Sequence, residues 1–342
     1  MSERAAVDAT AVAKSWPDGT RAIDAITCSA RPGEVTAVVG PNAAGKSTLL
    51  QILAGALAPD SGQRSVLATR LAPGELAPAA LRKRIGYLSQ ATELDPEMTC
   101  GEHLKLFATL HGVARRDRDD VVDAVAAAFE LTEDRARLTK QCSGGRRRRL
   151  HVACSLIHDP DLLILDEPMA GLDPDGRAKL WRQLRDRADR GCAVILASHD
   201  LDEVERYADA VWVLAGGNIT AADQPRALAE AHGHRAVVAT FESATAAVRA
   251  HERAAAIVGV RSVEAASNRL ILQLEDQGVN RGDVLARLEH VSEGLAGLDL
   301  QRADLNSAVA NLTGSPLLQT PARERGTGSG RAPGTGRGRR GG

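Results

Sequence analysis

The chain has 342 residues, more than the roughly 100–200 residues of one domain, so about two domains are expected. Hydrophobic residues make up 44% of it and charged residues 25%, as in ordinary globular proteins, but aromatic residues only 2%. So few aromatic side chains exclude a module that stacks nucleic-acid bases, and a formal net charge of −1 excludes a globally basic binder, so no specific nucleic-acid partner is expected.

A phosphate-binding loop is predicted near the N-terminus. Residues 35–39 have the pattern of a short buried strand, and the apolar stretch 49–57 has the length and spacing of a helix. Between them, GPNAAGKST fits the pattern G-x-x-x-x-G-K-[ST]. The glycines let backbone N–H groups converge on phosphate oxygens, and the following helix adds the positive end of its dipole. Lys46 would then reach the terminal phosphates of a nucleotide, and the Ser47 hydroxyl would ligate Mg²⁺.

The whole loop is expected to hold the nucleotide phosphates. Position 43 is Ala, which has less freedom than Gly to adopt a positive φ. The residues of the predicted loop are Gly40, Pro41, Asn42, Ala43, Ala44, Gly45, Lys46, Ser47 and Thr48.

Further along, residues 97–158 have a mostly helical pattern and interrupt the strands of the predicted sheet. They are interpreted as an inserted helical subdomain, which spans about residues 91–158. Arg146–Arg149 form a basic run at a predicted helix start, and most of these side chains are expected to be solvated.

Two buried strands that end in polar residues come next. The stretch 162–165 is apolar and is followed by Asp166 and Glu167, while the stretch 193–197 precedes His199. Parallel strands of an α/β sheet gather such residues at one edge, where ligands bind. Asp166 would orient Mg²⁺, Glu167 would accept a proton from an attacking water, and His199 would hydrogen-bond the γ-phosphate.

The pattern changes near residue 229. Strands are predicted at 236–241, 260–265, 270–274 and 298–300, and helices at 243–257, 281–291 and 304–312. The order βαββαβ is typical of a small ferredoxin-like α+β module.

From residue 315 the chain is rich in Gly and carries six arginines against one glutamate. Such a segment cannot bury a core, so residues 315–342 are expected to form a disordered basic tail. The predicted division is therefore an ATP-binding domain at 1–228, an accessory domain at 229–314 and this tail.

The chain is expected to lie in the cytoplasm. No apolar run approaches the roughly 18 residues of a membrane-spanning helix, and the N-terminus lacks a basic region followed by an apolar one. Five cysteines without a C-x-x-C pair support neither a disulfide framework nor a zinc ribbon, and a reducing compartment fits this usage.

Over residues 6–226 the motifs, their order and their spacing resemble the ATP-binding subunit of ABC transporters. The loop at residues 40–48 is similar to the Walker A motif of that family, and Asp166 with Glu167 to Walker B. The segment 142–146 (CSGGR) is similar to the signature motif LSGGQ, although Cys142 and Arg146 depart from it.

The resemblance implies a P-loop ABC-type ATPase core with an antiparallel β subdomain and a helical subdomain, which binds ATP and Mg²⁺. It implies roles for four further positions. Gln90 is the Q-loop glutamine, which senses Mg²⁺, and Trp16 lies where the family stacks an aromatic ring on adenine. Asp173 belongs to the D-loop, and His199 is the switch histidine.

In the family, the signature caps the ATP that is held by the opposite subunit. Ser143, Gly144 and Gly145 would take that role here, in a head-to-tail dimer with an identical or paralogous ATPase. The resemblance further implies a separate polytopic permease, with this chain peripheral on the inner face of the membrane.

Three stretches of sequence resemble drug exporter ATPases of the daunorubicin-resistance type: the residues around the signature, the segment after the Q-loop and the closing DLNSAVANLTG. The resemblance therefore implies ATP hydrolysis that powers a drug, antibiotic or lipid exporter. An alternative is a soluble ABC-type ATPase that acts in protein or cofactor assembly. Membership of a translation or repair branch is disfavoured, because there is no second phosphate loop and no sustained heptad pattern.

Overall fold

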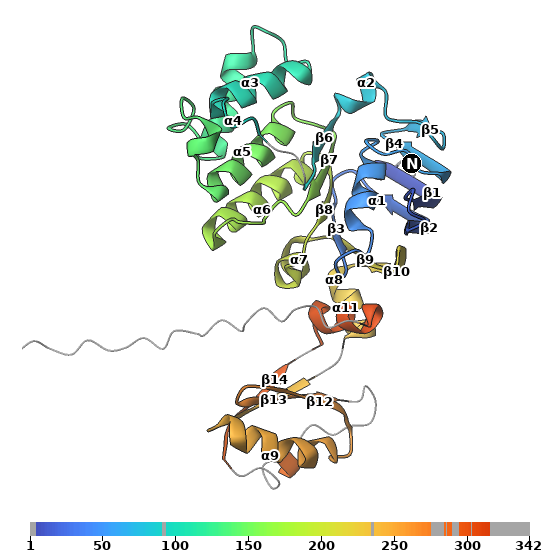
Figure 1. Ribbon diagram of the computed structural model, residues 1–342, viewed down its shortest axis with the longest axis vertical. Coiled ribbons are helices and arrows are strands. Elements are labelled where there is room, and N and C mark those ends of the chain that lie inside the picture. Colours follow the sequence, from blue (N-terminus) through green and yellow to red (C-terminus); the bar gives the residue numbers. More distant parts are fainter. Residues whose placement is uncertain are drawn as a thin grey trace, which may run out of the picture.

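The computed structural model describes residues 5–90, 94–233, 236–274, 284, 286–288, 294–301 and 303–314, whose strands form three sheets (Figure 1). The strands are β1 (Val7–Ser15), β2 (Arg21–Ala30), β3 (Val35–Val39), β4 (Ser61–Val66), β5 (Thr69–Leu71), β6 (Ile85–Leu88), β7 (Leu162–Asp166), β8 (Ala193–Ala197), β9 (Ala210–Ala215), β10 (Asn218–Asp223), β11 (Ala236–Phe241), β12 (Val260–Ala266), β13 (Arg269–Leu274) and β14 (Leu295–Gln301). The helices are α1 (Lys46–Leu53), α2 (Ala79–Arg82), α3 (Cys100–Leu110), α4 (Arg118–Ala128), α5 (Gly144–Leu156), α6 (Pro174–Asp189), α7 (Leu201–Tyr207), α8 (Pro225–His232), α9 (Ala244–Ala255) and α11 (Leu305–Thr313), with a 3-10 turn at Thr139–Gln141.

The central sheet has the order β10-β9-β3-β8-β7-β6, and all its pairs are parallel except that of β10 with β9. Every residue of β3, β7 and β8 is buried, which is why these strands are apolar along their whole length and show no alternation. The three buried strands predicted from the sequence are thereby confirmed.

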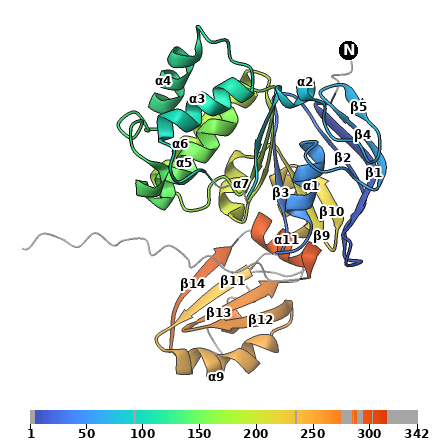
Figure 2. The same ribbon diagram turned by 45° about the horizontal axis from the view of Figure 1, so that its top comes forward.

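Different layers cover the two faces of the central sheet. On one face, α1 and the antiparallel sheet β2-β1-β4-β5 share a core with Val38, Leu162 and Ile164. On the other face, α3, α4, α5 and α6 share a core with Val39 and Leu165 (Figure 2). The phosphate-loop helix α1 and the signature helix α5 therefore lie on opposite sides of the sheet.

Helix α1 is shorter than predicted. It ends at Leu53, whereas the apolar pattern continues to residue 57. The reason is Gly55, whose φ of +70° ends the helix, and an added Cβ there would lie 2.3 Å from the Cβ of Ala77. Apolar spacing alone does not reveal such an ending.

The helical insert consists of α3, α4 and α5. Thr99 and Glu102 form a capping box at the start of α3, and Ser143 caps α5 by accepting a hydrogen bond from the N–H of Arg146. Among the described residues, no helix is long and apolar enough to cross a membrane.

After α8 the chain forms the third sheet, in the order β12-β13-β11-β14 with antiparallel pairs. Numbered in chain order within this sheet, the strands lie in the order 2-3-1-4, which is that of a ferredoxin-like fold. Helix α9 covers the side of the sheet that faces away from the rest of the chain (Figure 1). The predicted helix at 281–291 falls mostly outside the described residues, as does the predicted tail at 315–342.

The chain then returns to the ATPase core through α11. This helix packs against α7, α8 and β9, and Leu305 and Val309 are fully buried there. The N–H of Leu305 donates to Oε2 of Glu205 (3.1 Å), and Nδ2 of Asn306 to Oδ1 of Asp202 (2.8 Å). The last helix of the predicted accessory range is therefore attached to the core.

Candidate active site

The carboxyl ends of four neighbouring parallel strands bring the phosphate loop, Gln90, Asp166, Glu167 and His199 to one edge of the sheet. Register explains this, because Val38 of β3 and Asp166 of β7 both pair with Ala197 of β8. The residues that follow β3, β7 and β8 must then lie side by side. Gln90 comes two residues after β6, the next strand of the sheet, and is exposed.

The backbone of the phosphate loop depends on its two glycines. Gly40 has φ +147°, and an added Cβ would lie 2.1 Å from the carbonyl oxygen of Leu214. Gly45 has φ +101°, and its Cβ would lie 2.4 Å from the carbonyl oxygen of Ala22. Both positions therefore require glycine for two reasons, the positive φ and the close backbone.

Lys46 opens α1 and is 8% exposed. Its Nζ donates to the carbonyl oxygens of Gly40 (2.8 Å) and Pro41 (3.0 Å), which fold the side chain back over the loop. Burial lowers the pKa of Lys46, and the charges of Glu167 and Asp166 oppose that shift. A buried ammonium group with neutral contacts provides a ready counter-charge for phosphate.

Ala43 has φ +62°, the left-handed conformation that a Cβ disfavours. The loop therefore forms in spite of Ala at this position, and it does so with local backbone strain.

Glu167 also has a positive φ, +51°, at the point where the chain leaves β7. Burial raises the pKa of its carboxyl group to about 6, with a contribution from Asp166, while Lys46 and Arg148 act in the opposite direction. A carboxylate that titrates near neutral pH is suited to accept a proton from water.

His199 follows β8, and its Nε2 lies 2.9 Å from Oε1 of Glu167. That carboxylate oxygen is buried and makes no hydrogen bond within the described residues. Burial lowers the pKa of His199, and the charge of Lys46 adds to this shift while that of Asp166 opposes it. Glu167 and His199 were predicted for one site from separate strand ends, and the structure brings them together.

The signature residues lie apart from these groups, on α5. Ser143 and Gly144 are exposed at the N-terminus of this helix, and an added Cβ at Gly144 would meet no atom within 4 Å. An added Cβ at Gly145 would lie 3.3 Å from the carbonyl oxygen of Gly171, beside the D-loop, where Asp173 is exposed at the N-cap position of α6.

The two residues that differ from the family signature, Cys142 and Arg146, both contact other side chains of the helical insert. Cys142 is buried, and its Sγ lies 3.6 Å from Sγ of Cys100. Nε of Arg146 lies 3.0 Å from Oδ2 of Asp134, a buried carboxylate whose Oδ1 also pairs with Arg137 at 3.0 Å. The substitutions are therefore built into the packing of the helical insert.

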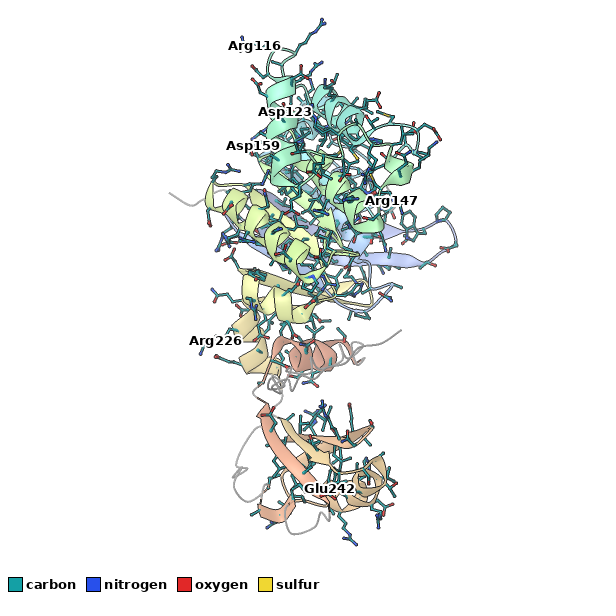
Figure 3. The ribbon with its side chains drawn as sticks, turned by 90° about the vertical axis from the view of Figure 1, so that its left-hand side faces the viewer. Arg116, Asp123, Arg147, Asp159, Arg226 and Glu242 are labelled. Carbon is teal, nitrogen blue, oxygen red and sulfur yellow. The ribbon has the colours of Figure 1, made fainter. Side chains whose placement is uncertain are left out.

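The expectation that the basic run is solvated holds for Arg147, which is exposed (Figure 3), and is wrong for Arg148. The guanidinium of Arg148 is directed at the end of β7, where it donates to three carbonyl oxygens, those of Asp166, Glu167 and Pro168. The sequence offered no sign of this contact, because an arginine in a basic run looks like any other.

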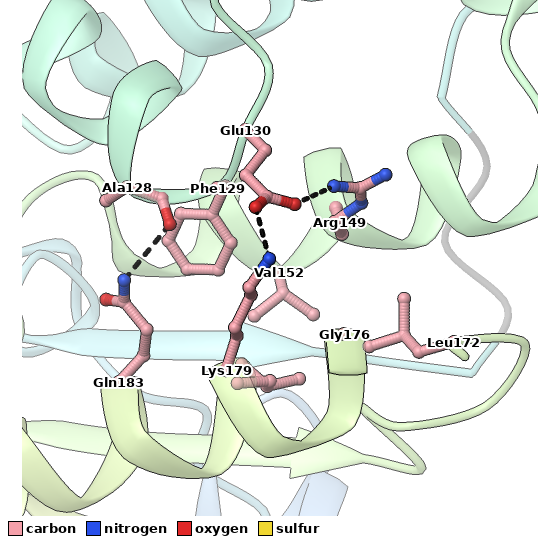
Figure 4. Close-up of a pocket in the computed structure, with 10 residues that line it drawn as sticks. Ala128, Phe129, Glu130, Arg149, Val152, Leu172, Gly176, Lys179 and Gln183 are labelled. Carbon is pink, nitrogen blue, oxygen red and sulfur yellow. Dashed lines mark hydrogen bonds and ion pairs between the residues drawn. The ribbon is translucent and has the colours of Figure 1, made fainter. Parts of the chain in front are cut away.

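Two further arginines join motifs that are distant in sequence. Nε of Arg177 donates to the carbonyl oxygen of Leu172 in the D-loop (3.2 Å), and its Nη1 to Oδ2 of Asp200 beside His199 (2.9 Å). Arg149 pairs with Glu130, which also contacts Lys179, at a surface hollow between α4, α5 and α6 (Figure 4). This hollow is lined mainly by apolar atoms and lies away from the phosphate loop.

Trp16 lies in the turn between β1 and β2, where its backbone N–H donates to the carbonyl oxygen of Thr20 (2.8 Å). Trp16 is 39% exposed, and few other large apolar residues in the described part of the chain are exposed. Such a ring is free to stack on a planar ligand.

These residues fit a nucleoside triphosphate with Mg²⁺. Among the described residues, the hydrogen bonds of the Lys46 ammonium go to the carbonyl oxygens of Gly40 and Pro41, and the buried Oε1 of Glu167 makes no hydrogen bond although Nε2 of His199 lies 2.9 Å away. The hydroxyl of Ser47 and the carboxylate of Asp166 are hard oxygen donors, which Mg²⁺ prefers.

Comparison with known proteins agrees with this geometry. Residues 23–170 match the family described as ABC transporter. A daunorubicin resistance ATP-binding protein of Streptomyces coeruleorubidus is 32% identical over 299 residues, which are 86% of this chain and 92% of that protein. The chain belongs to the ABC transporter family. As the ATP-binding subunit of this family, it is an ATP hydrolase.

Two further relatives of this ABC ATPase are informative. A Nod factor export ATP-binding protein I of Rhizobium etli is 37% identical over 224 residues, 65% of this chain and 69% of that protein. A solved structure of an ATP-binding subunit of an ABC transporter superposes with a TM-score of 0.60 at 26% identity, over 65% of this chain and 91% of that one. The likeness to the daunorubicin resistance protein covers more of this chain than either of these two matches.

Proposed function

We propose that this ABC ATPase powers a membrane exporter whose substrate is a drug, an antibiotic or a lipid. Relatives named for daunorubicin resistance and for Nod factor export support this direction of transport. The match over most of the chain favours the resistance type, because it extends past the ATPase core. The predicted division into domains at 1–228, 229–314 and 315–342 belongs to this proposal.

In the proposed cycle, the loop from Gly40 to Thr48 holds the phosphates and Trp16 stacks on the adenine. Lys46 neutralises the terminal phosphates, and Glu167 takes the proton of the attacking water while His199 orients the γ-phosphate. Ser47, Asp166 and Gln90 would hold Mg²⁺, which neutralises developing charge on the phosphates when bound.

Two chains would act together, head to tail. The observation that carries this proposal is the separation of the two half-sites. Lys46 and Glu167 serve the loop on one side of the central sheet, while Ser143 and Gly144 are exposed at the N-terminus of α5 on the other. A helix N-terminus with a hydroxyl and free N–H groups suits a phosphate of a second chain. Gly145 and Asp173 would complete that cap.

The permease would be a separate polytopic protein, and the ATPase would lie against it on the cytoplasmic face of the membrane. Exposed apolar side chains on α3, Leu106 at 40% and Leu110 at 62%, follow the segment after Gln90 and support contact with such a partner.

A co-purification tests the proposal. The full chain with Glu167→Gln, which slows reopening, is used as bait in mild detergent with ATP and Mg²⁺, and the same bait without nucleotide is the control. We expect a polytopic membrane protein in about equal amount, together with ATP-dependent pairing of the bait. Recovery of soluble partners alone, with no bait in the membrane fraction, would contradict the exporter and favour a soluble assembly ATPase.

A further inference from the structure

Arg148 is unusual among the arginines of the signature helix because its guanidinium is aimed at the backbone of the catalytic strand. Nη2 donates to the carbonyl oxygens of Asp166 (2.7 Å) and Glu167, and Nε donates to that of Pro168 (3.2 Å). Burial lowers the pKa of this guanidinium, against the attraction of Asp166 and Glu167. The guanidinium group thus donates its hydrogen bonds to three successive peptide groups.

Those peptide groups are the ones that need a restraint. The backbone of Glu167 has φ +51°, a conformation that costs free energy for any residue with a Cβ and persists only where the surroundings hold it. The planar fork of an arginine can bond several carbonyl oxygens at once, which an ammonium group cannot do with the same geometry. Among the described residues, Arg148 therefore has the side chain that bonds this turn and can hold it.

The direction of the Glu167 carboxylate depends on that turn. Oε1 of Glu167 lies 2.9 Å from Nε2 of His199, beside the phosphate loop. A shift of the peptide groups of residues 166–168 would turn the carboxylate away from the position at which it meets an attacking water, and a displacement of about 1 Å costs up to about 100-fold in rate.

We propose that Arg148 is a positioning residue for ATP hydrolysis: it holds the peptide carbonyls of Asp166, Glu167 and Pro168 and so fixes the carboxylate of Glu167. The inference rests on the proposed role of Glu167 as the base. Since Arg148 lies five residues after Ser143 in the same sequence and on the helix that Ser143 caps, the contact also ties the position of the signature helix to that of the base.

The test compares steady-state hydrolysis of ATP by the full chain carrying Arg148→Gln or Arg148→Lys. We expect kcat to fall about 10- to 100-fold in Arg148→Gln and less in Arg148→Lys, with KM and the affinity for ATP unchanged. Arg147→Gln is the matched control, because it removes the same charge from the exposed neighbouring position of the same helix. It should hydrolyse ATP like the parent chain.

A merely structural role for Arg148 would give a different pattern. If the loss of rate follows the loss of folded protein in thermal unfolding, or if KM rises as much as kcat falls, the proposal is wrong. Equal rates of Arg148→Gln and the parent would also overturn it. Glu167→Gln, measured alongside, separates the proposed role of Glu167 from that of Arg148. If Glu167→Gln remains active, the assignment of Glu167 as the base is wrong. If Glu167→Gln is inactive while Arg148→Gln is fully active, only the inference about Arg148 is wrong.

Discussion

The phosphate-loop region and the signature segment of this ABC ATPase respond differently to departures from the family pattern. In the signature segment, residues 142–149, Cys142 packs on Cys100 and Arg146 pairs with the buried Asp134. In the phosphate-loop region, residues 40–48, Ala43 adopts φ +62°. A side chain that differs from the family pattern can be accommodated by contact with a neighbouring side chain. A residue that must adopt a positive φ bears the conformational strain itself.

The largest effect is expected where the phosphate-loop region meets β7. Replacing Glu167→Gln removes the proposed acceptor of the proton from the attacking water, so hydrolysis should fall by about 10²–10⁴-fold while ATP still binds. Release of phosphate and binding of a fluorescent ATP analogue measure the two quantities. Glu133→Gln, an exposed change of the same chemistry in the helical insert, is the control. A loss of binding equal to the loss of rate would place Glu167 in binding alone.

The pH dependence of hydrolysis should report the same carboxylate. Burial raises the pKa of Glu167 to about 6, and only the ionised form can act as a base. The rate should therefore be at its plateau above that pH and fall about tenfold per pH unit below it. Rapid-quench measurements from pH 5 to 8 would show this limb. An acid limb near the ordinary pKa of a glutamate, about 4.3, would mean that the site is wetter than its geometry indicates.

In the signature segment the larger effect should be on stability. Asp134 is buried, and its two carboxylate oxygens lie 3.0 Å from Arg137 and from Arg146. Asp134→Asn leaves both guanidinium groups without their anion and should cost about 2 kcal/mol in the free energy of unfolding. Urea denaturation measures it.

Asp123→Asn is the matched control for this prediction. Asp123 pairs with Arg135 at the surface of α4 (Figure 3), so its loss should stay within about 0.5 kcal/mol. If the two variants were equally stable, the buried pair would not be what anchors the substituted signature.

The same contrast explains what the sequence could predict. The strands at 35–39, 162–165 and 193–197 were predictable because parallel buried strands are apolar along their whole length, and the residues after them must share one edge of the sheet. The strands of the third sheet were predictable because turns and apolar runs mark them locally. These features depend on short stretches of chain.

The features that the sequence did not reveal depend on distant contacts. Arg148 bonds carbonyl oxygens about 20 positions away, and α11 packs on a helix that precedes it by about 100 residues. The positive φ of Glu167 is likewise held by its surroundings. No local pattern distinguishes Arg148 from Arg147, so its function needed the folded chain.

The smallest effect concerns Ala43 and tests the other half of the comparison. Its φ of +62° costs about 1–2 kcal/mol for a residue with a Cβ, and Gly avoids that cost but loses more entropy on folding. Ala43→Gly should therefore stabilise the chain by about 0.5–1 kcal/mol in urea denaturation, whereas Ala44→Gly, at a buried neighbour without a positive φ, should destabilise it. If Ala43→Gly also destabilised the chain, the strain at position 43 would be smaller than its conformation indicates, and the phosphate-loop region would tolerate its departure as well as the signature segment does.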